Sequence, residues 1–283
     1  MVGIILALAG AAALGSVLLI SMKIGGNVNS QMLGISIGFL IVSAGSYLFA
    51  VPIMNNVTWV FGFVSGLLLA VGMYHQLLAA KKLGVSKTVP VTSGLQLIGI
   101  TFFSVLLFKE WSSPFSLALG GMAIILISCG ILLISLWIRA VHKKDHSVKF
   151  TFTLIYSALG FIGFLALNRF FDLDQWSAMF PQGLGLTAGT ALLSLKGKPF
   201  TKFAFRNIVT GLALSAGNIF LILSLPLLGT GPSFSFAQLG TALSTAGGLY
   251  LLRERSTRKQ AAFILISSIL IIAGGVALGY TKG

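Results

Sequence analysis

The chain has 283 residues, of which 56% are hydrophobic and 8% charged, and its net charge is +14. A water-soluble domain of this length needs far more charge to cover its surface, so the composition excludes that class and predicts an integral membrane protein. A basic excess is also found in nucleic-acid-binding proteins. In a membrane protein it indicates cytoplasmic loops rich in Lys and Arg, and we expect no nucleic-acid partner.

Ten apolar segments follow one another along the chain, each long enough to cross a bilayer as a helix of roughly 20 residues. They cover residues 2–22, 31–51, 57–80, 88–108, 114–138, 150–168, 175–195, 203–225, 232–252 and 259–280. No positively charged region precedes the first segment, and further spans follow, so we interpret it as a transmembrane helix rather than a signal peptide. All ten are expected to be helices, because the backbone must satisfy itself in lipid and no alternating barrel pattern is present.

The basic residues orient these spans. Sixteen of the 19 Lys and Arg residues fall in the loops that join spans one and two, three and four, five and six, seven and eight, and nine and ten. The positive-inside rule places these loops in the cytoplasm and both termini outside the cell. The single cysteine, Cys129, lies in an apolar run, so no intramolecular disulfide can form.

An internal repeat relates the two parts of the chain. L-L-F-K-E-W-S-S at 106–113 aligns with Y-L-L-R-E-R-S-T at 250–257, at an offset of 144 residues. Upstream, G-L-L-L-A-V-G at 66–72 aligns with G-L-A-L-S-A-G at 211–217 at an offset of 145.

The repeat predicts two five-helix halves, 1–139 and 150–283, joined by a cytoplasmic linker at 140–149. An odd number of spans per half forces the second half to enter from the other side. Inverted repeats of this kind place a substrate site near the membrane midplane and permit alternating access. The alternative is an old duplication retained only for packing.

Two glutamines occupy repeat-equivalent positions, Gln96 in the fourth span and Gln238 in the ninth. An amide in a bilayer needs hydrogen-bond partners, and two amides facing one cavity offer donors and acceptors to a polyhydroxylated ligand. Pro90 and Gly94 are expected to loosen the first turns of the fourth span. Alternatively, each glutamine bonds a neighbouring helix, a contact typically worth ~1 kcal/mol or less.

Other polar and aromatic residues in the spans extend the set of candidates. Further substrate-binding candidates are Gln76, Thr92, Ser93, Gln182, Asn218 and Ser235, with Trp59 and Tyr156 as aromatic stacking partners. Trp and Tyr near span ends are also typical interfacial anchors. His75 is the titratable residue placed well within a span, and it is a candidate for coupling or gating, or else a neutral hydrogen-bonded imidazole.

The five acidic residues all fall at helix ends or in loops. Glu110 and Glu254 are repeat-equivalent, and we interpret them as ion pairs at helix ends or as gate elements. No buried carboxylate is present to bind a cationic drug or relay protons. The sequence contains no catalytic motif and no clustered metal ligands, so we expect no enzyme activity, no cofactor and no metal site.

Several motifs together resemble the bacterial glucose uptake proteins of the glucose/ribose porter family. They are K-I-G-G (23–26) with Gln31, G-V-S-K-T-V-P-V-T-S-G-L-Q-L-I-G (84–99), E-W (110–111), P-Q-G-L-G (181–185), A-G-N (216–218) and S-F-A-Q-L-G-T-A-L-S-T-A-G-G (235–248). The resemblance implies the drug/metabolite transporter (DMT), or EamA-like, fold: an all-α integral membrane protein with ten transmembrane helices as two inverted five-helix repeats. It also implies import of glucose or a related monosaccharide, driven by protons, across a bacterial cell membrane.

The polar residues that the resemblance carries over are Thr92, Ser93, Gln96, Gln182, Asn218, Ser235 and Gln238. Two motifs depart from the family. L-A-V-G-M (69–73) stands where the family usually has W-A-x-G-Q, so the amide at Met73 is missing and Gln76 is the candidate to serve instead. A-L-G-S (13–16) lacks the usual aromatic residue. Both departures bear on the identity of the sugar.

Two other functions remain open on the sequence alone. One is an exporter of amino acids or other small metabolites on the same fold, with Arg169 as the charge complement for a zwitterion. The other is a non-transporting lipid- or partner-binding membrane subunit, in which the central amides bond each other and leave no cavity. Monomer and homodimer are both compatible with the sequence.

Overall fold

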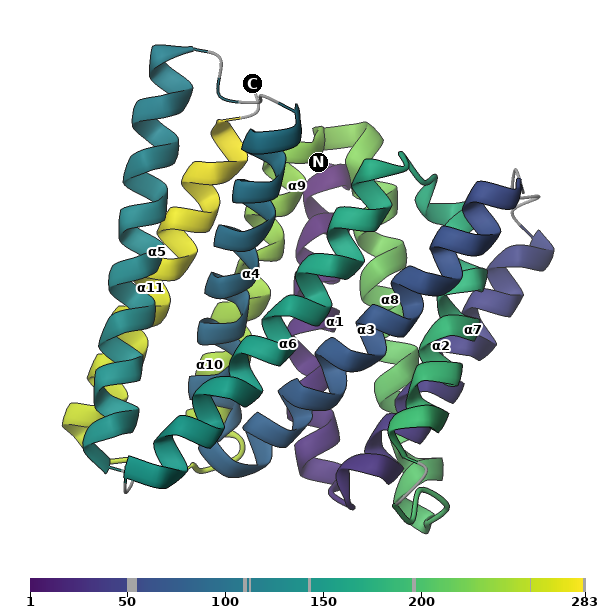
Figure 1. Ribbon diagram of the computed structural model, residues 1–283, viewed down its shortest axis with the longest axis horizontal. Coiled ribbons are helices and arrows are strands. Elements are labelled where there is room, and N and C mark those ends of the chain that lie inside the picture. Colours follow the sequence, from purple (N-terminus) through teal and green to yellow (C-terminus); the bar gives the residue numbers. More distant parts are fainter. Residues whose placement is uncertain are drawn as a thin grey trace.

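The computed structural model describes residues 1–49, 55–108, 111, 113–141, 144–194, 197–254 and 256–281. These residues form eleven helices and no strand (Figure 1). The helices are α1 (Val2–Ile24), α2 (Val28–Phe49), α3 (Asn56–Leu83), α4 (Val85–Phe108), α5 (Pro114–Val141), α6 (Lys144–Phe170), α7 (Gln175–Leu193), α8 (Lys202–Leu228), α9 (Thr230–Ala237), α10 (Leu239–Tyr250) and α11 (Arg258–Tyr280). The prediction of an all-helical membrane protein is therefore confirmed for the described residues.

Eight of these helices are long and apolar enough to cross a membrane: α1, α2, α3, α4, α5, α6, α8 and α11. The span expected at 175–195 is the 19-residue helix α7, which does not belong to this set. Its sequence includes Ser177, Gln182, Thr187 and Thr190, which lower its hydropathy. α6 starts at Lys144, so the predicted linker at 140–149 is partly helical.

The prediction of one continuous helix at 232–252 is wrong, because α9 ends at Ala237 and α10 begins at Leu239. Gln238 lies at the break. Its N–H donates to the Ser235 carbonyl at 3.2 Å, and its own carbonyl accepts from the Thr241 N–H at 3.0 Å. Both bonds span three residues instead of four, so the chain tightens locally and the regular α-helical ladder is interrupted.

Helices from the two parts of the chain pack against each other in a reciprocal pattern. α3 packs against α6 and α7, and α8 packs against α1 and α2. α4 contacts α6 and α10, while α5 and α11 lie side by side at one edge of the bundle (Figure 1). Small residues allow these close approaches: a Cβ on Gly38 of α2 would lie 2.2 Å from the Ile208 carbonyl oxygen of α8.

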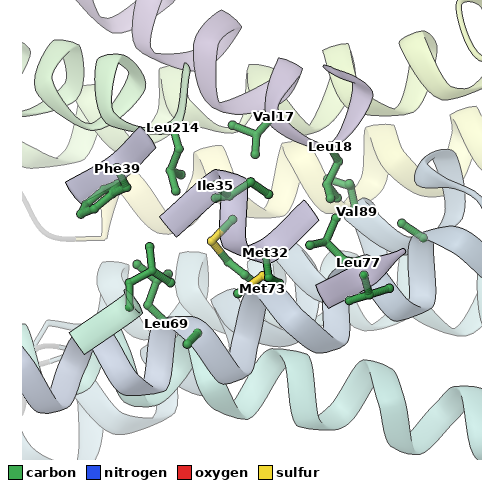
Figure 2. Close-up of a cluster of buried hydrophobic side chains, with 14 of the residues drawn as sticks. Val17, Leu18, Met32, Ile35, Phe39, Leu69, Met73, Leu77, Val89 and Leu214 are labelled. Carbon is green, nitrogen blue, oxygen red and sulfur yellow. The ribbon is translucent and has the colours of Figure 1, made fainter. Parts of the chain in front are cut away.

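The main apolar core joins α1, α2, α3, α4, α7 and α8 (Figure 2). Met73, which stands where the family usually has an amide, is 3% exposed and belongs to this core together with Met32 and Leu77. The departure from the family motif therefore adds a buried apolar contact between helices at this position.

Candidate functional site

The site is built around the crossing of α4 and α10. The Thr241 hydroxyl of α10 donates to the Ser93 hydroxyl oxygen of α4 at 3.3 Å. Gln96 lies three residues after Ser93 and Gln238 three residues before Thr241. The end of α10 approaches the start of α4, so the two helices are antiparallel. Residues three apart share a helix face, and both amides therefore lie about one turn beyond the same contact.

A glycine of α11 closes this arrangement from a third side. A Cβ on Gly275 would lie 2.9 Å from Gln238 Cγ and 3.0 Å from Leu97 Cδ1. Gln238 and the residue that follows Gln96 thus meet over one glycine. The approach of the two repeat-equivalent glutamines to each other stays a prediction.

The amides of Gln96, Gln238 and Asn218 are partly buried. Within the described part of the chain, no hydrogen bond joins any of these three side chains to another residue. An amide that bonded a neighbouring helix, or the opposite amide, would show such a contact. These three side chains retain their donors and acceptors for water or a ligand.

Gln76 and Thr92 are bonded to each other instead. Gln76 Nε2 donates to Thr92 Oγ1 at 2.9 Å, which ties α3 to α4. Thr92 is fully buried, and its hydroxyl lies 2.9 Å from the Thr88 carbonyl oxygen, to which it donates. One Gln76 donor is therefore used within the protein, which limits how much of this amide can face a ligand.

Gln182 also has a partner in the protein. It is 7% exposed, and its Nε2 donates to Asn168 Oδ1 of α6 at 2.7 Å. Asn168 Nδ2 in turn donates to the Phe164 carbonyl at 2.6 Å. The sequence interpretation did not identify Asn168, although it is an amide at the end of an apolar run. α7 packs against α2 and α3, away from the α4–α10 crossing.

The two aromatic candidates lie on the outer surface of the bundle. Trp59 is 37% exposed and packs edge to face on Phe180, with 5.9 Å between ring centroids. Tyr156 is 51% exposed, and its ring centroid lies 5.5 Å from that of His75. Such exposure is typical of residues that contact lipid or its interface.

His75 and Ser235 each contact a backbone carbonyl. His75 Nδ1 lies 2.8 Å from the Val71 carbonyl oxygen one turn earlier in α3. The Ser235 hydroxyl donates to the Val276 carbonyl of α11 at 3.4 Å. No group of three or more His, Cys, Asp or Glu side chains able to hold a metal ion occurs among the residues that the structure describes.

Glu254 lies in the loop between α10 and α11, and its carboxylate reaches the start of α4. Oε1 accepts from the Val85 N–H at 2.5 Å, and Oε2 accepts from the Ser86 N–H at 3.2 Å and from the Ser86 hydroxyl. The sequence suggested an ion pair or a gate but gave no partner on α4. Glu110, its repeat equivalent, lies outside the described residues.

The chain is similar to known proteins over its whole length. It matches the family described as sugar transport protein over residues 5–281. The probable glucose uptake protein GlcU of Priestia megaterium is 43% identical over 272 residues, which are 95% of each chain. The glucose uptake protein GlcU of Bacillus subtilis strain 168 is 41% identical over 282 residues, 99% of this chain and 98% of the relative. A putative sugar uptake protein of Bacillus anthracis is 41% identical over 281 residues, 99% of each chain.

These matches confirm the resemblance that the motifs indicated, and they agree with a fold rich in membrane-spanning helices. The chain belongs to the sugar transport protein family.

Proposed function

We propose that this protein is a secondary transporter that imports glucose or a related monosaccharide by alternating access. The observation that carries the proposal is the pair of amides, Gln96 and Gln238, which lie one turn beyond the Ser93–Thr241 contact without hydrogen-bond partners among the described residues. Neutral amides suit a neutral, hydroxyl-rich ligand, since each offers both donors and acceptors. The names of the curated relatives point to the same substrate class.

The proposed architecture has ten crossings in two inverted halves, 1–139 and 150–283. α9 and α10 together form one crossing, because their 8 and 12 residues with the break between them extend roughly 30 Å. A helix broken within the membrane is typical of transporter binding sites. The reciprocal packing of α3 on α6 and α7, and of α8 on α1 and α2, supports the inverted relation.

Within this architecture, Gln96, Gln238 and Asn218 form the centre of the proposed sugar site. A site built to bond hydroxyls rejects ligands that lack them, because its polar groups would stay unpaired. The proposed secondary contributors are Gln76, Thr92, Ser93, Ser235 and Gln182, which already have partners in the protein, and Trp59 and Tyr156, which face outward.

We also propose that transport is coupled to protons. His75 is the candidate carrier, since it is a titratable side chain well within a span and, among the described residues, its Nδ1 contacts only a backbone carbonyl of its own helix. Glu254 and Glu110 are the proposed gating residues at opposite faces of the membrane.

Uptake into proteoliposomes tests the function. Radiolabelled glucose is supplied with and without an inward proton gradient, to wild type and to Gln96→Ala and Gln238→Ala. Because each variant removes ligand-bonding groups whose partners would then be unpaired, we expect at least a tenfold loss of uptake for either, in line with about 1.4 kcal/mol or more. Gln175→Ala is the matched control, since Gln175 is exposed at the start of α7.

Gradient-stimulated uptake that both variants lose supports proton-coupled import through the paired amides. Gradient-independent uptake that both lose supports facilitated transport through the same site. Folded wild-type protein that moves no glucose contradicts the assignment, and a panel of other sugars and amino acids then distinguishes the exporter alternative. Uptake at wild-type rates in both variants contradicts the proposal that Gln96 and Gln238 bind the sugar.

A further inference from the structure

The contact between Glu254 and α4 joins two segments far apart in the sequence. The carboxylate belongs to the loop after α10, and the groups it binds, the Val85 N–H, the Ser86 N–H and the Ser86 hydroxyl, start α4 some 170 residues earlier. The first N–H groups of a helix have no partner within the helix, and the helix dipole favours a negative charge there. Glu254 therefore satisfies the start of α4 from the other half of the molecule.

The local backbone is shaped for this contact. Gly84, just before α4, has φ +94°, and a Cβ there would lie 2.4 Å from Glu254 Oε2. A Cβ on Gly248 of α10 would lie 2.7 Å from the Ser86 nitrogen and 3.1 Å from Glu254 Oε1. Two glycines thus make room for the carboxylate between the end of α10 and the start of α4.

The same two helices meet again two turns farther along α4, at Ser93 and Thr241. Ser86, Val89 and Ser93 lie on one face of α4, and Val89 between the two contacts is 7% exposed. The interface between α4 and α10 therefore has polar contacts at Ser86 and at Ser93, and the second lies about one turn before the paired glutamines. A ligand held by Gln96 and Gln238 cannot leave along this interface unless both contacts break.

We propose that Glu254 is a latch: its carboxylate holds the start of α4 against the end of α10 and keeps the cytoplasmic exit of the sugar site closed. This inference rests on the proposed function and deepens it: it places the closed α4–α10 interface on the cytoplasmic side of the sugar site. Release of the α4 N-terminus from the carboxylate is the step that opens this interface. Glu254 acts through α4 and does not touch the sugar.

Cysteine labelling measures the opening directly and without any sugar. Cys129→Ser removes the single native cysteine, and Val89→Cys then places one thiol at a buried position of α4, in sequence between its contacts with Glu254 and Thr241. A membrane-impermeant maleimide is added to inverted membrane vesicles, which present the cytoplasmic face. Glu254→Gln is expected to speed labelling about five- to tenfold, the population shift that follows from losing a charged helix cap.

Two further variants grade the effect. Glu254→Asp keeps the charge on a shorter side chain and is expected to label at an intermediate rate. Ser86→Ala removes only the hydroxyl donor and is expected to speed labelling about two- to threefold, as befits the loss of one hydrogen bond. Ser86→Ala also keeps the test decisive if Glu254→Gln does not fold.

Asp174→Asn is the matched control. Asp174 caps α7 in the same way, accepting from the Ser177 N–H at 2.8 Å and the Ser177 hydroxyl at 2.6 Å, but within one segment. It is expected to leave Val89→Cys labelling unchanged. Equal labelling rates in Glu254→Gln and its parent, or an equal rise in Asp174→Asn, overturn the latch. Faster labelling in Glu254→Gln in a protein that moves no sugar keeps the latch and overturns only sugar import.

Discussion

At the scale of single residues, the glutamines and asparagines of the spans divide into two kinds. Gln96, Gln238 and Asn218 have no hydrogen bond to another described residue, whereas Gln182 is bonded to Asn168. A buried amide without a partner costs about 1–3 kcal/mol, and the partly buried amides of the first kind avoid this cost where water or a ligand reaches them. Gln182, whose amide is hydrogen-bonded to Asn168, needs no ligand to explain its presence in a span.

The Gln182–Asn168 pair yields a prediction about stability. Asn168→Leu removes the acceptor of a side chain that is 7% exposed, so unfolding is expected to become easier by about 1–3 kcal/mol. The double variant Asn168→Leu/Gln182→Leu removes both polar groups and is expected to recover most of the loss. The apparent melting temperature in detergent measures both. If Asn168→Leu is as stable as wild type, the Gln182–Asn168 hydrogen bond does not stabilise the fold. If the double variant still takes up glucose, Gln182 is not part of the sugar site.

At the scale of helices, the long apolar segments could be predicted because length and hydropathy decide them locally. The break at Gln238 could not, since F-S-F-A-Q-L contains neither Pro nor Gly, and the interruption depends on what α9 and α10 pack against. The helix cap from Glu254 was missed for a related reason: its donors lie in another helix far along the chain. The pairing of Gln96 with Gln238 could be proposed from sequence because the repeat relates the two positions directly.

Helix packing yields a prediction with a built-in comparison. A Cβ on Gly66 of α3 would lie 2.2 Å from the Gln182 carbonyl oxygen of α7, a backbone atom that cannot move aside alone. Gly66→Ala is therefore expected to cost about 1–3 kcal/mol through overpacking. Gly45→Ala in α2 meets nothing within 4 Å and is expected to be neutral or to gain up to about 1 kcal/mol from helix propensity. Thermal unfolding in detergent compares them, and equal melting temperatures would show that the close approach of α3 and α7 does not limit stability.

At the scale of the whole molecule, the start of α1 and the end of α11 lie on the same side of the bundle (Figure 1). An even number of crossings requires this arrangement. The loops rich in Lys and Arg then gather on the opposite side, where the α10–α11 loop carries Glu254. The orientation of the molecule in the membrane therefore decides whether the α4–α10 interface faces the cytoplasm. It also decides whether Glu254 closes the inner or the outer opening of the sugar site.

Two single-cysteine variants in the Cys129→Ser background decide that direction. Val2 at the start of α1 is 65% exposed, and Phe200 between α7 and α8 is 84% exposed, so both thiols are accessible to reagent. Because 16 of the 19 basic residues fall in the set of loops that includes the one with Phe200, the positive-inside rule predicts that Val2 lies outside the cell. An impermeant maleimide on intact cells is expected to label Val2→Cys at once and Phe200→Cys only after permeabilisation. The reverse pattern would invert the molecule, place the Glu254 contact at the outer face and turn the proposed exit latch into an entry gate.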